Sequence, residues 1–254
     1  MQTVNRRVVL GGLAAFSIVR PTHAKTPEDF SVEADEGSVA LVRYAADQAG
    51  KRAGIIVLHG SRGIELKPRA YQRYADALNA IGIDVYLARY FTASDLQVFD
   101  PKTSTRERRE AYETKRFEGW AKRVSSVVTT VLARPDSSGR IGLLGFSLGG
   151  FVAASTAARD DRIAALAVLY GGMPDVMVSD VKRLPPLIEL HGEADRNVPL
   201  AKGQELVKLA KAVGSAAELV TYPGKEHGFD FSDTDPMTAD AIGRVSRFFQ
   251  ARLG

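Results

Sequence analysis

The sequence predicts a single α/β domain with a mostly parallel central sheet and helices on both of its faces. Short apolar runs alternate with segments of helical period from about residue 39 to residue 252. This alternation is typical of parallel strands joined by crossover helices. No linker, repeat or low-complexity segment interrupts it, and 254 residues are enough for one full-size domain.

The strands are predicted from short apolar runs. Residues 55–58 read Ile-Ile-Val-Leu, a continuous run expected of a central strand that is buried on both faces. Similar runs extend the sheet on either side of this strand. The predicted strands are 39–44, 55–58, 85–88, 141–144, 163–169, 187–190 and 218–222.

The segments between these strands have apolar residues at helical spacing, and Gly82 and Gly214 mark two helix ends. The first half of residues 105–133 is dense in charge, which fits either an anion-binding patch or a solvated face with i,i+4 ion pairs. Both signs are mixed along it, which favours the solvated face. The predicted helices are 68–80, 105–133, 148–158, 200–213 and 237–252.

Residues 1–24 read as an export signal, followed by a catalytic domain over residues 25–254. Asn5-Arg6-Arg7 precedes an apolar stretch at 8–19, and Thr22-His23-Ala24 offers a small-residue cleavage site. The arginine pair resembles the twin-arginine motif, and an ordinary Sec signal or a short buried helix are the alternatives. The pattern predicts a periplasmic or secreted protein.

Composition excludes several classes of site and partner. There are no cysteines, so disulfides, zinc–thiolate sites and cysteine nucleophiles are absent. Three of the 34 basic residues and none of the 30 acidic ones precede residue 25, so the predicted domain is nearly neutral. We therefore expect no nucleic-acid partner and no stable membrane association after signal removal, with a monomer favoured. The histidine spacing and the glycine pattern match no metal, phosphate or dinucleotide motif, so no metal and no cofactor are expected.

Ser147 is the candidate nucleophile. Gly145-Phe146-Ser147-Leu148-Gly149 directly follows a predicted strand and opens a predicted helix, the context of a nucleophile elbow. Larger residues at the two glycines would collide with the neighbouring strand and helix in so tight a turn. The alternative is a glycine-rich turn with an idle serine.

His227 is the candidate base that accepts the serine proton. It lies in the loop 223–229, between the last strand and the last helix, where a Ser–acid–His chain order requires the base. His59 and His191 each end a strand and precede a glycine, and His59 is more readily explained as a structural residue of its loop.

Asp195 is the candidate acid that orients the imidazole. It lies in the loop 191–199, which follows a predicted strand and precedes a predicted helix. Glu193 in the same loop and Asp175 in the loop after the preceding strand are the rivals.

An oxyanion hole needs two backbone amides. The amide of Leu148, next to the nucleophile, is the first candidate. The second is the amide of Ser61, in the glycine-rich loop His59-Gly60-Ser61-Arg62-Gly63 that follows a predicted strand.

Together, these motifs resemble those of the dienelactone hydrolase family of α/β-hydrolases, over residues 40–252. They are Leu58-His59-Gly60, the segment 145–150, the segment 191–199 and Glu226-His227-Gly228-Phe229. The resemblance implies an α/β-hydrolase fold with at most eight strands and hydrolysis of an ester or lactone without a cofactor.

Two positions depart from the founding members of that family. Ser147 stands where they carry a cysteine, and Gly60 stands where they carry a glutamate that contacts the resting thiol. The resemblance also aligns Tyr90 with the family's tyrosine, so Tyr90 and the preceding Arg89 are expected to line the substrate site. We expect a serine esterase with a Ser-His-Asp triad. A peptidase or amide hydrolase and a non-catalytic binding protein are the alternatives.

Overall fold

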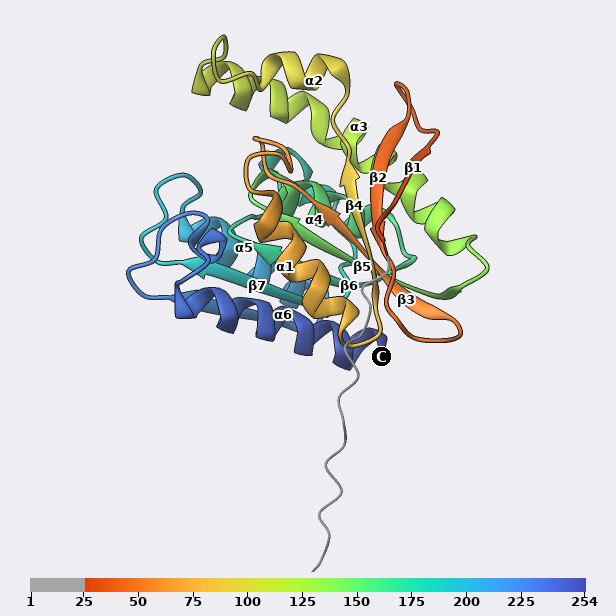
Figure 1. The fold of residues 1–254 in the computed structure, drawn as a ribbon. Coiled ribbons are helices and arrows are strands. Elements are labelled where there is room, and N and C mark those ends of the chain that lie inside the picture. Colours follow the sequence, from red (N-terminus) through yellow and green to blue (C-terminus); the bar gives the residue numbers. More distant parts are fainter. Residues whose placement is uncertain (1–25) are drawn as a thin grey trace, which may run out of the picture.

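The computed structural model describes residues 26–254, so the export signal predicted for residues 1–24 lies outside the described residues. The described part is built on one eight-stranded sheet in the order β1-β2-β4-β3-β5-β6-β7-β8 (Figure 1). The α/β-hydrolase fold predicted from the sequence is confirmed. The strands are β1 (Glu28–Val32), β2 (Val39–Tyr44), β3 (Arg52–Leu58), β4 (Asp84–Arg89), β5 (Ser137–Phe146), β6 (Ile163–Leu169), β7 (Leu187–Gly192) and β8 (Ala217–Tyr222).

Most of the sheet is parallel. Only β1–β2 and β2–β4 pair antiparallel among the described strands. From β4 to β8 every neighbouring pair is parallel, so the carboxyl ends of these strands meet at one edge of the sheet. β1 has no predicted counterpart because its sequence, Glu-Asp-Phe-Ser-Val, has little apolar content.

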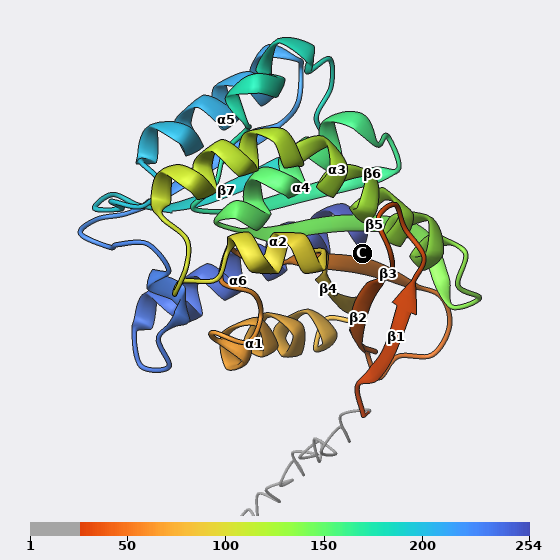
Figure 2. The same cartoon turned by 90° about the horizontal axis from the view of Figure 1, so that it is seen from above.

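Helices cover both faces of the sheet (Figure 2). α1 and α6 lie on one face, and α3, α4 and α5 on the other. No helix within residues 26–254 is both long and apolar enough to span a bilayer. The helices are α1 (Pro68–Asn79), α2 (Ala93–Val98), α3 (Arg106–Leu132), α4 (Leu148–Arg159), α5 (Leu200–Ala212) and α6 (Pro236–Leu253), with short 3₁₀ turns η1 (Asp175–Asp180) and η2 (Phe229–Phe231).

The core is divided by the sheet into two layers. Along β3, Ile56 and Leu58 pack into the layer with α3 and α4, whereas Ile55 and Val57 pack into the layer with α1 and α6. All four side chains are at most 1% exposed. A strand buried on both faces reads as a continuous apolar run, which is why this strand was predicted from its sequence.

α2 and the start of α3 form a segment that stands beyond the sheet (Figure 1). Asp95 on α2 is fully buried and ties this helix to α3. This carboxylate accepts hydrogen bonds from the Thr92 amide at 2.6 Å, the Tyr112 hydroxyl at 2.9 Å, and Arg116 Nε and Trp120 Nε1 at 3.0 Å. α2 was not predicted, because its six residues are too few for a helical period.

Candidate active site

Ser147 occupies the turn between β5 and α4 with φ 53° and ψ −122°, a conformation that non-glycine residues rarely adopt. Its amide donates to Leu169 O at 2.9 Å, which holds the turn against β6. A Cβ at Gly145 would lie 2.2 Å from Gly149 O, and a Cβ at Gly149 would lie 2.2 Å from Leu58 O. Both glycines are therefore required by the close approach of backbone, as the sequence predicted.

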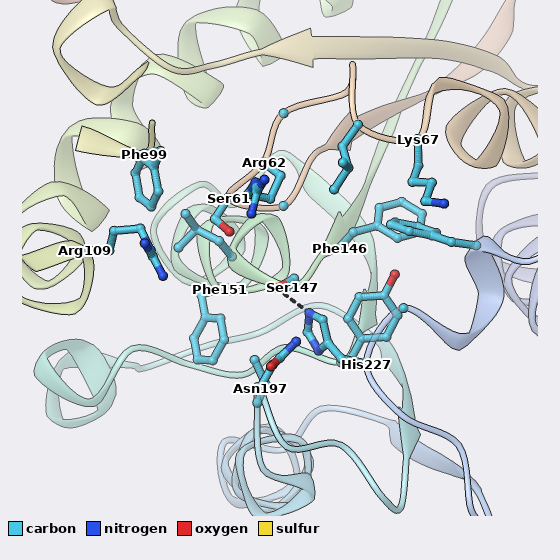
Figure 3. Close-up of a pocket in the computed structure, with 18 of the residues that line it drawn as sticks. Ser61, Arg62, Lys67, Phe99, Arg109, Phe146, Ser147, Phe151, Asn197 and His227 are labelled. Carbon is cyan, nitrogen blue, oxygen red and sulfur yellow. Dashed lines mark hydrogen bonds between the residues drawn. The ribbon is translucent and has the colours of Figure 1, made fainter. Parts of the chain in front are cut away.

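Three predicted side chains converge at this turn. Ser147 Oγ lies 2.9 Å from His227 Nε2 (Figure 3), and His227 Nδ1 lies 2.7 Å from Asp195 Oδ2. The Asp195 side chain is fully buried, while that of His227 is 19% exposed. With Asp195 ionised, Nδ1–H donates to it and Nε2 is left to accept the serine proton.

Asp195 is kept ionised by the groups around it. Its Oδ1 accepts hydrogen bonds from the amides of Asn197 at 2.8 Å and Val198 at 2.9 Å. Burial alone favours the neutral acid, but hydrogen bonds from His191 and His227 hold the pKa of Asp195 well below its usual range.

The acid loop and the histidine loop are joined by their backbones. The Ala194 amide donates to Lys225 O at 2.9 Å, and the Glu193 amide to Tyr222 O at 3.0 Å. A Cβ at Gly192 would lie 2.3 Å from Lys225 O, so only glycine allows this approach. Asp195 and His227 are therefore positioned by one joined pair of loops at the ends of β7 and β8.

The rival residues are bonded elsewhere. Glu193 accepts from the Thr221 hydroxyl at 2.8 Å, and the exposed Asp175 pairs with Lys202 at 2.6 Å. His59 is buried, stacks on the Tyr90 ring and bonds Gly60 O through Nδ1 at 2.8 Å. Burial lowers the pKa of His59 to about 4, so it is neutral and structural, as expected from its loop position.

The two predicted oxyanion donors flank Ser147. Leu148 is the first residue of α4, where the backbone amide has no partner within the helix. Ser61 lines the same cavity, on the loop whose Gly60 lies so close that a Cβ there would be 3.3 Å from Ser147 Cβ (Figure 3). The positive end of the α4 dipole adds to the potential at this point.

Ser147 and His227 open into a cavity of about 790 Å³. Its lining includes the apolar side chains of Phe99, Phe146 and Phe151, and cationic side chains reach in from the loop after β3 and from α3 (Figure 3). Among these cations, Arg62, Lys67 and Arg109 form no salt bridge to any described residue, whereas Arg106 pairs with Glu110. The Arg109 guanidinium donates a hydrogen bond to the Ser104 carbonyl at 3.0 Å.

The charged start of α3 is therefore not only the solvated face that its mixed charges favoured, because it also lines the cavity. Arg106 and Glu110 form an exposed i,i+4 pair at 2.6 Å, as that interpretation expects. The same turn of the helix lines the cavity, together with Glu113. Burial and the neighbouring Glu110 raise the pKa of Glu113 to about 7, so this carboxyl only partly offsets the cations.

Two predicted substrate-binding residues do not reach the cavity. Tyr90 is fully buried, and its hydroxyl donates to His59 O at 2.9 Å beneath the loop. Arg89 points to Glu65, with Nε 3.0 Å from the carboxylate, and it does not line the cavity. The expectation taken from the family resemblance was wrong for both side chains, because the end of β4 lies behind the loop 59–63.

A buried pair behind Asp195 was missed from the sequence. His191 Nδ1 lies 2.8 Å from Glu189 Oε1, and its Nε2 lies 2.9 Å from Val198 O and 3.5 Å from Asp195 Oδ2. The available signal was a glutamate inside the apolar strand Leu-Ile-Glu-Leu. Within residues 26–254 no three His, Asp or Glu side chains are placed to hold a metal ion, and here both imidazole nitrogens already have hydrogen-bond partners.

Residues 39–252 match the model of the dienelactone hydrolase family. Among curated proteins, a 44-residue stretch is 43% identical to isoprenylcysteine alpha-carbonyl methylesterase of Arabidopsis thaliana, covering 17% of this chain and 10% of that protein. The match therefore spans about a tenth of that relative's length.

Solved structures share the fold over almost the whole chain. The dienelactone hydrolase of Anabaena variabilis superposes with a TM-score of 0.70 at 21% identity, over 90% of this chain and 99% of that one. A dienelactone hydrolase-like promiscuous phosphotriesterase from metagenomic libraries gives 0.76 at 17% identity, over 91% and 100%. A thermostable carboxylesterase from a metagenomic library gives 0.70 at 17% identity, over 91% and 90%.

Proposed function

Because this chain belongs to the dienelactone hydrolase family, a family of hydrolases, we propose that it cleaves a carboxylic ester or lactone through an acyl-enzyme on Ser147. The single observation that carries the proposal is the unbroken chain of contacts Ser147–His227–Asp195, at 2.9 and 2.7 Å. Both distances are within the range of a nucleophile, its base and the base's orienting acid.

The reaction follows from these contacts. His227 Nε2 takes the Ser147 hydroxyl proton as Oγ attacks the ester carbonyl carbon, and the resulting imidazolium is stabilised by the buried Asp195. The amides of Leu148 and Ser61 hold the oxyanion of the tetrahedral intermediate. His227 then passes its proton to the leaving alkoxide, and the acyl group stays on Ser147. Water, deprotonated by His227, attacks this ester, and His227 returns the proton to Ser147 Oγ as the acid leaves.

The cavity supports an acidic ester as the preferred substrate class. Its phenylalanine side chains suit a hydrocarbon portion, and Arg62, Lys67 and Arg109 offer positive charge without a salt bridge to any described carboxylate. A substrate that carries a carboxylate some distance from the scissile bond complements both parts. The choice of ester over amide follows the esterases among the similar proteins.

A fluorophosphonate probe tests the nucleophile. We expect the wild-type chain to be labelled and Ser147→Ala to be unlabelled. Equal labelling of the two, or no labelling of wild type, would refute the proposal.

A substrate panel tests the bond and the charge. We expect kcat/KM to be higher for 4-nitrophenyl hemisuccinate than for the neutral 4-nitrophenyl butyrate, and negligible for aminoacyl 4-nitroanilides. Faster cleavage of the anilides would favour a peptidase, and labelling without turnover of any ester would favour a binding role.

We also propose that residues 1–24 direct export of the protein across a bacterial inner membrane. The basic start, the apolar stretch and the small residues at Thr22-His23-Ala24 support this. N-terminal sequencing of periplasmic protein should begin at Lys25, and an intact Met1 there would refute it.

A further inference from the structure

Core packing alone does not explain the buried pair Glu189–His191. Both side chains are fully buried, and Glu189 Oε2 has no hydrogen-bond partner within the described residues. A Cβ at Gly203 of α5 would lie 2.7 Å from the Glu189 carboxyl, so the carboxyl is tightly enclosed. Replacing a buried ionic pair by apolar residues of similar volume is often neutral or stabilising, so stability alone does not account for the pair.

The hydrogen-bond partners of His191 fix where its protons lie. Val198 O, 2.9 Å from Nε2, can only accept, so Nε2 carries a hydrogen. At Nδ1 a second proton is shared with Glu189 Oε1 over 2.8 Å. Burial raises the pKa of Glu189. Burial opposes charge on His191 too, but hydrogen bonds with Asp195 and Glu189 raise its pKa to about 10.

The Nε2–H of His191 also faces the acid of the proposed triad. Nε2 lies 3.5 Å from Asp195 Oδ2, the same oxygen that lies 2.7 Å from His227 Nδ1. Oδ1 is already held by two backbone amides. Asp195 thus lies between two imidazoles, one of which contacts Ser147 and one of which does not.

We propose that His191 is a positioning residue of the hydrolytic site: its Nε2–H holds Asp195 Oδ2, the oxygen that also contacts His227, and the buried Glu189 keeps that hydrogen in place. This inference rests on the proposed function. It extends the chain of contacts to Glu189–His191–Asp195–His227–Ser147.

Few other charged groups face this chain. On β7 the neighbour is Glu189, α5 presents Gly203 without a side chain, and β8 places Thr221 opposite His191 in register. On α5, Lys202 is paired with Asp175 and Glu205. His227 is additionally flanked by the Tyr170 ring, 4.6 Å between centroids. A change in pH dependence on altering Glu189 and His191 is therefore attributable to that pair.

Two matched double variants of the full chain test the proposal. Glu189→Leu/His191→Phe removes the donor together with its buried partner, whereas Glu189→Leu/His191→Gln restores an amide donor near the Nε2 position. With 4-nitrophenyl hemisuccinate we expect the Phe variant to lose roughly tenfold or more in kcat with little change in KM, because the group that orients Asp195 is gone. The Gln variant should recover most of that loss.

The pH profile separates positioning from packing. Both variants remove a cationic group that lies 3.5 Å from Asp195 Oδ2, so we expect the acidic limb of kcat/KM to move to higher pH in both. Ile188→Val, also on β7, is the control that loosens the core and should leave the limb unmoved. Wild-type kcat and an unmoved limb in both double variants would overturn the proposal.

A measurement on the wild-type chain is independent of whether the variants fold. In ¹⁵N-histidine-labelled protein, the His191 ring, assigned through its contacts with Val198, should show Nε2 protonated from pH 6 to pH 8. An unprotonated Nε2 would overturn the proposal. The fluorophosphonate experiment on Ser147→Ala tests the proposed function alone and does not involve His191. Failure of the proposed function can therefore be distinguished from failure of the proposal about His191.

Discussion

Replacing Ser147 by glycine should give a more stable protein than replacing it by alanine, and both changes should abolish the proposed hydrolysis. Ser147 is held at φ 53° and ψ −122°, where a side chain is strained and glycine is not. We compare Ser147→Gly with Ser147→Ala, because both lack Oγ and differ only in the Cβ. The comparison therefore isolates the backbone strain from the loss of the contact with His227.

The magnitude follows from two opposing effects. A non-glycine residue in a sparsely populated region costs about 1–3 kcal/mol. Glycine loses about 0.4–1 kcal/mol through the greater freedom of the unfolded chain. We expect Ser147→Gly to exceed Ser147→Ala by about 1–2 kcal/mol in free energy of unfolding, or about 2–8 °C in Tm for a domain of this size.

The assay is thermal and urea unfolding of the two variants followed by circular dichroism. Ser126→Gly against Ser126→Ala is the matched control, since Ser126 lies within the regular helix α3. There the order should reverse, with the glycine variant less stable by about 1 kcal/mol. If glycine is the less stable residue at both positions, the argument from strain at Ser147 is wrong.

Three further predictions concern the acid, the cavity and a buried carboxyl. Asp195→Asn should lower kcat by roughly ten-thousandfold in the ester assay through the wrong imidazole tautomer; Glu193→Gln should leave kcat unchanged, and equal losses would contradict the assignment. Arg109→Gln should raise KM for 4-nitrophenyl hemisuccinate about fivefold, corresponding to about 1 kcal/mol; an equal rise for neutral 4-nitrophenyl butyrate would contradict a charge effect. Burial raises the pKa of Asp230 from 3.8 to about 6, so the folded state keeps a proton that the unfolded chain releases, and stability falls as pH rises through that window. Asp230→Asn should remove this fall, worth on the order of 3 kcal/mol; urea unfolding at pH 4 and pH 8 measures it, and a wild-type to variant difference that is the same at both values would refute it.

The sheet was predictable because its strands are buried on both faces. β3, β5 and β6 read as continuous apolar runs, and the helices between them have a clear apolar stripe. β1 and α2 were missed for physical reasons: β1 is an edge strand with polar side chains, and α2 is a six-residue helix stabilised by the buried Asp95 rather than by a repeating pattern.

The three residues of the proposed triad could be predicted from the sequence because each lies in a short local pattern. Ser147, Asp195 and His227 each lie in a loop whose position relative to a strand is visible in the sequence. The cavity was not predictable in this way, because Arg62 and Arg109 are 47 positions apart and meet only through the fold. Tyr90 was misplaced because the direction of a side chain at a strand end depends on the loop above it.

Because Asp95 anchors α2 to α3, part of the cavity lining lies on a segment separate from the residues proposed for catalysis. The groups proposed for catalysis come from loops after β3, β5, β7 and β8, whereas Phe99 and Arg109 come from the segment that Asp95 fixes. The strands that carry the triad do not pass through that segment. Exchange of residues 93–112 with Asp95 and Trp120 kept would therefore alter part of the cavity lining and leave the residues proposed for catalysis in place.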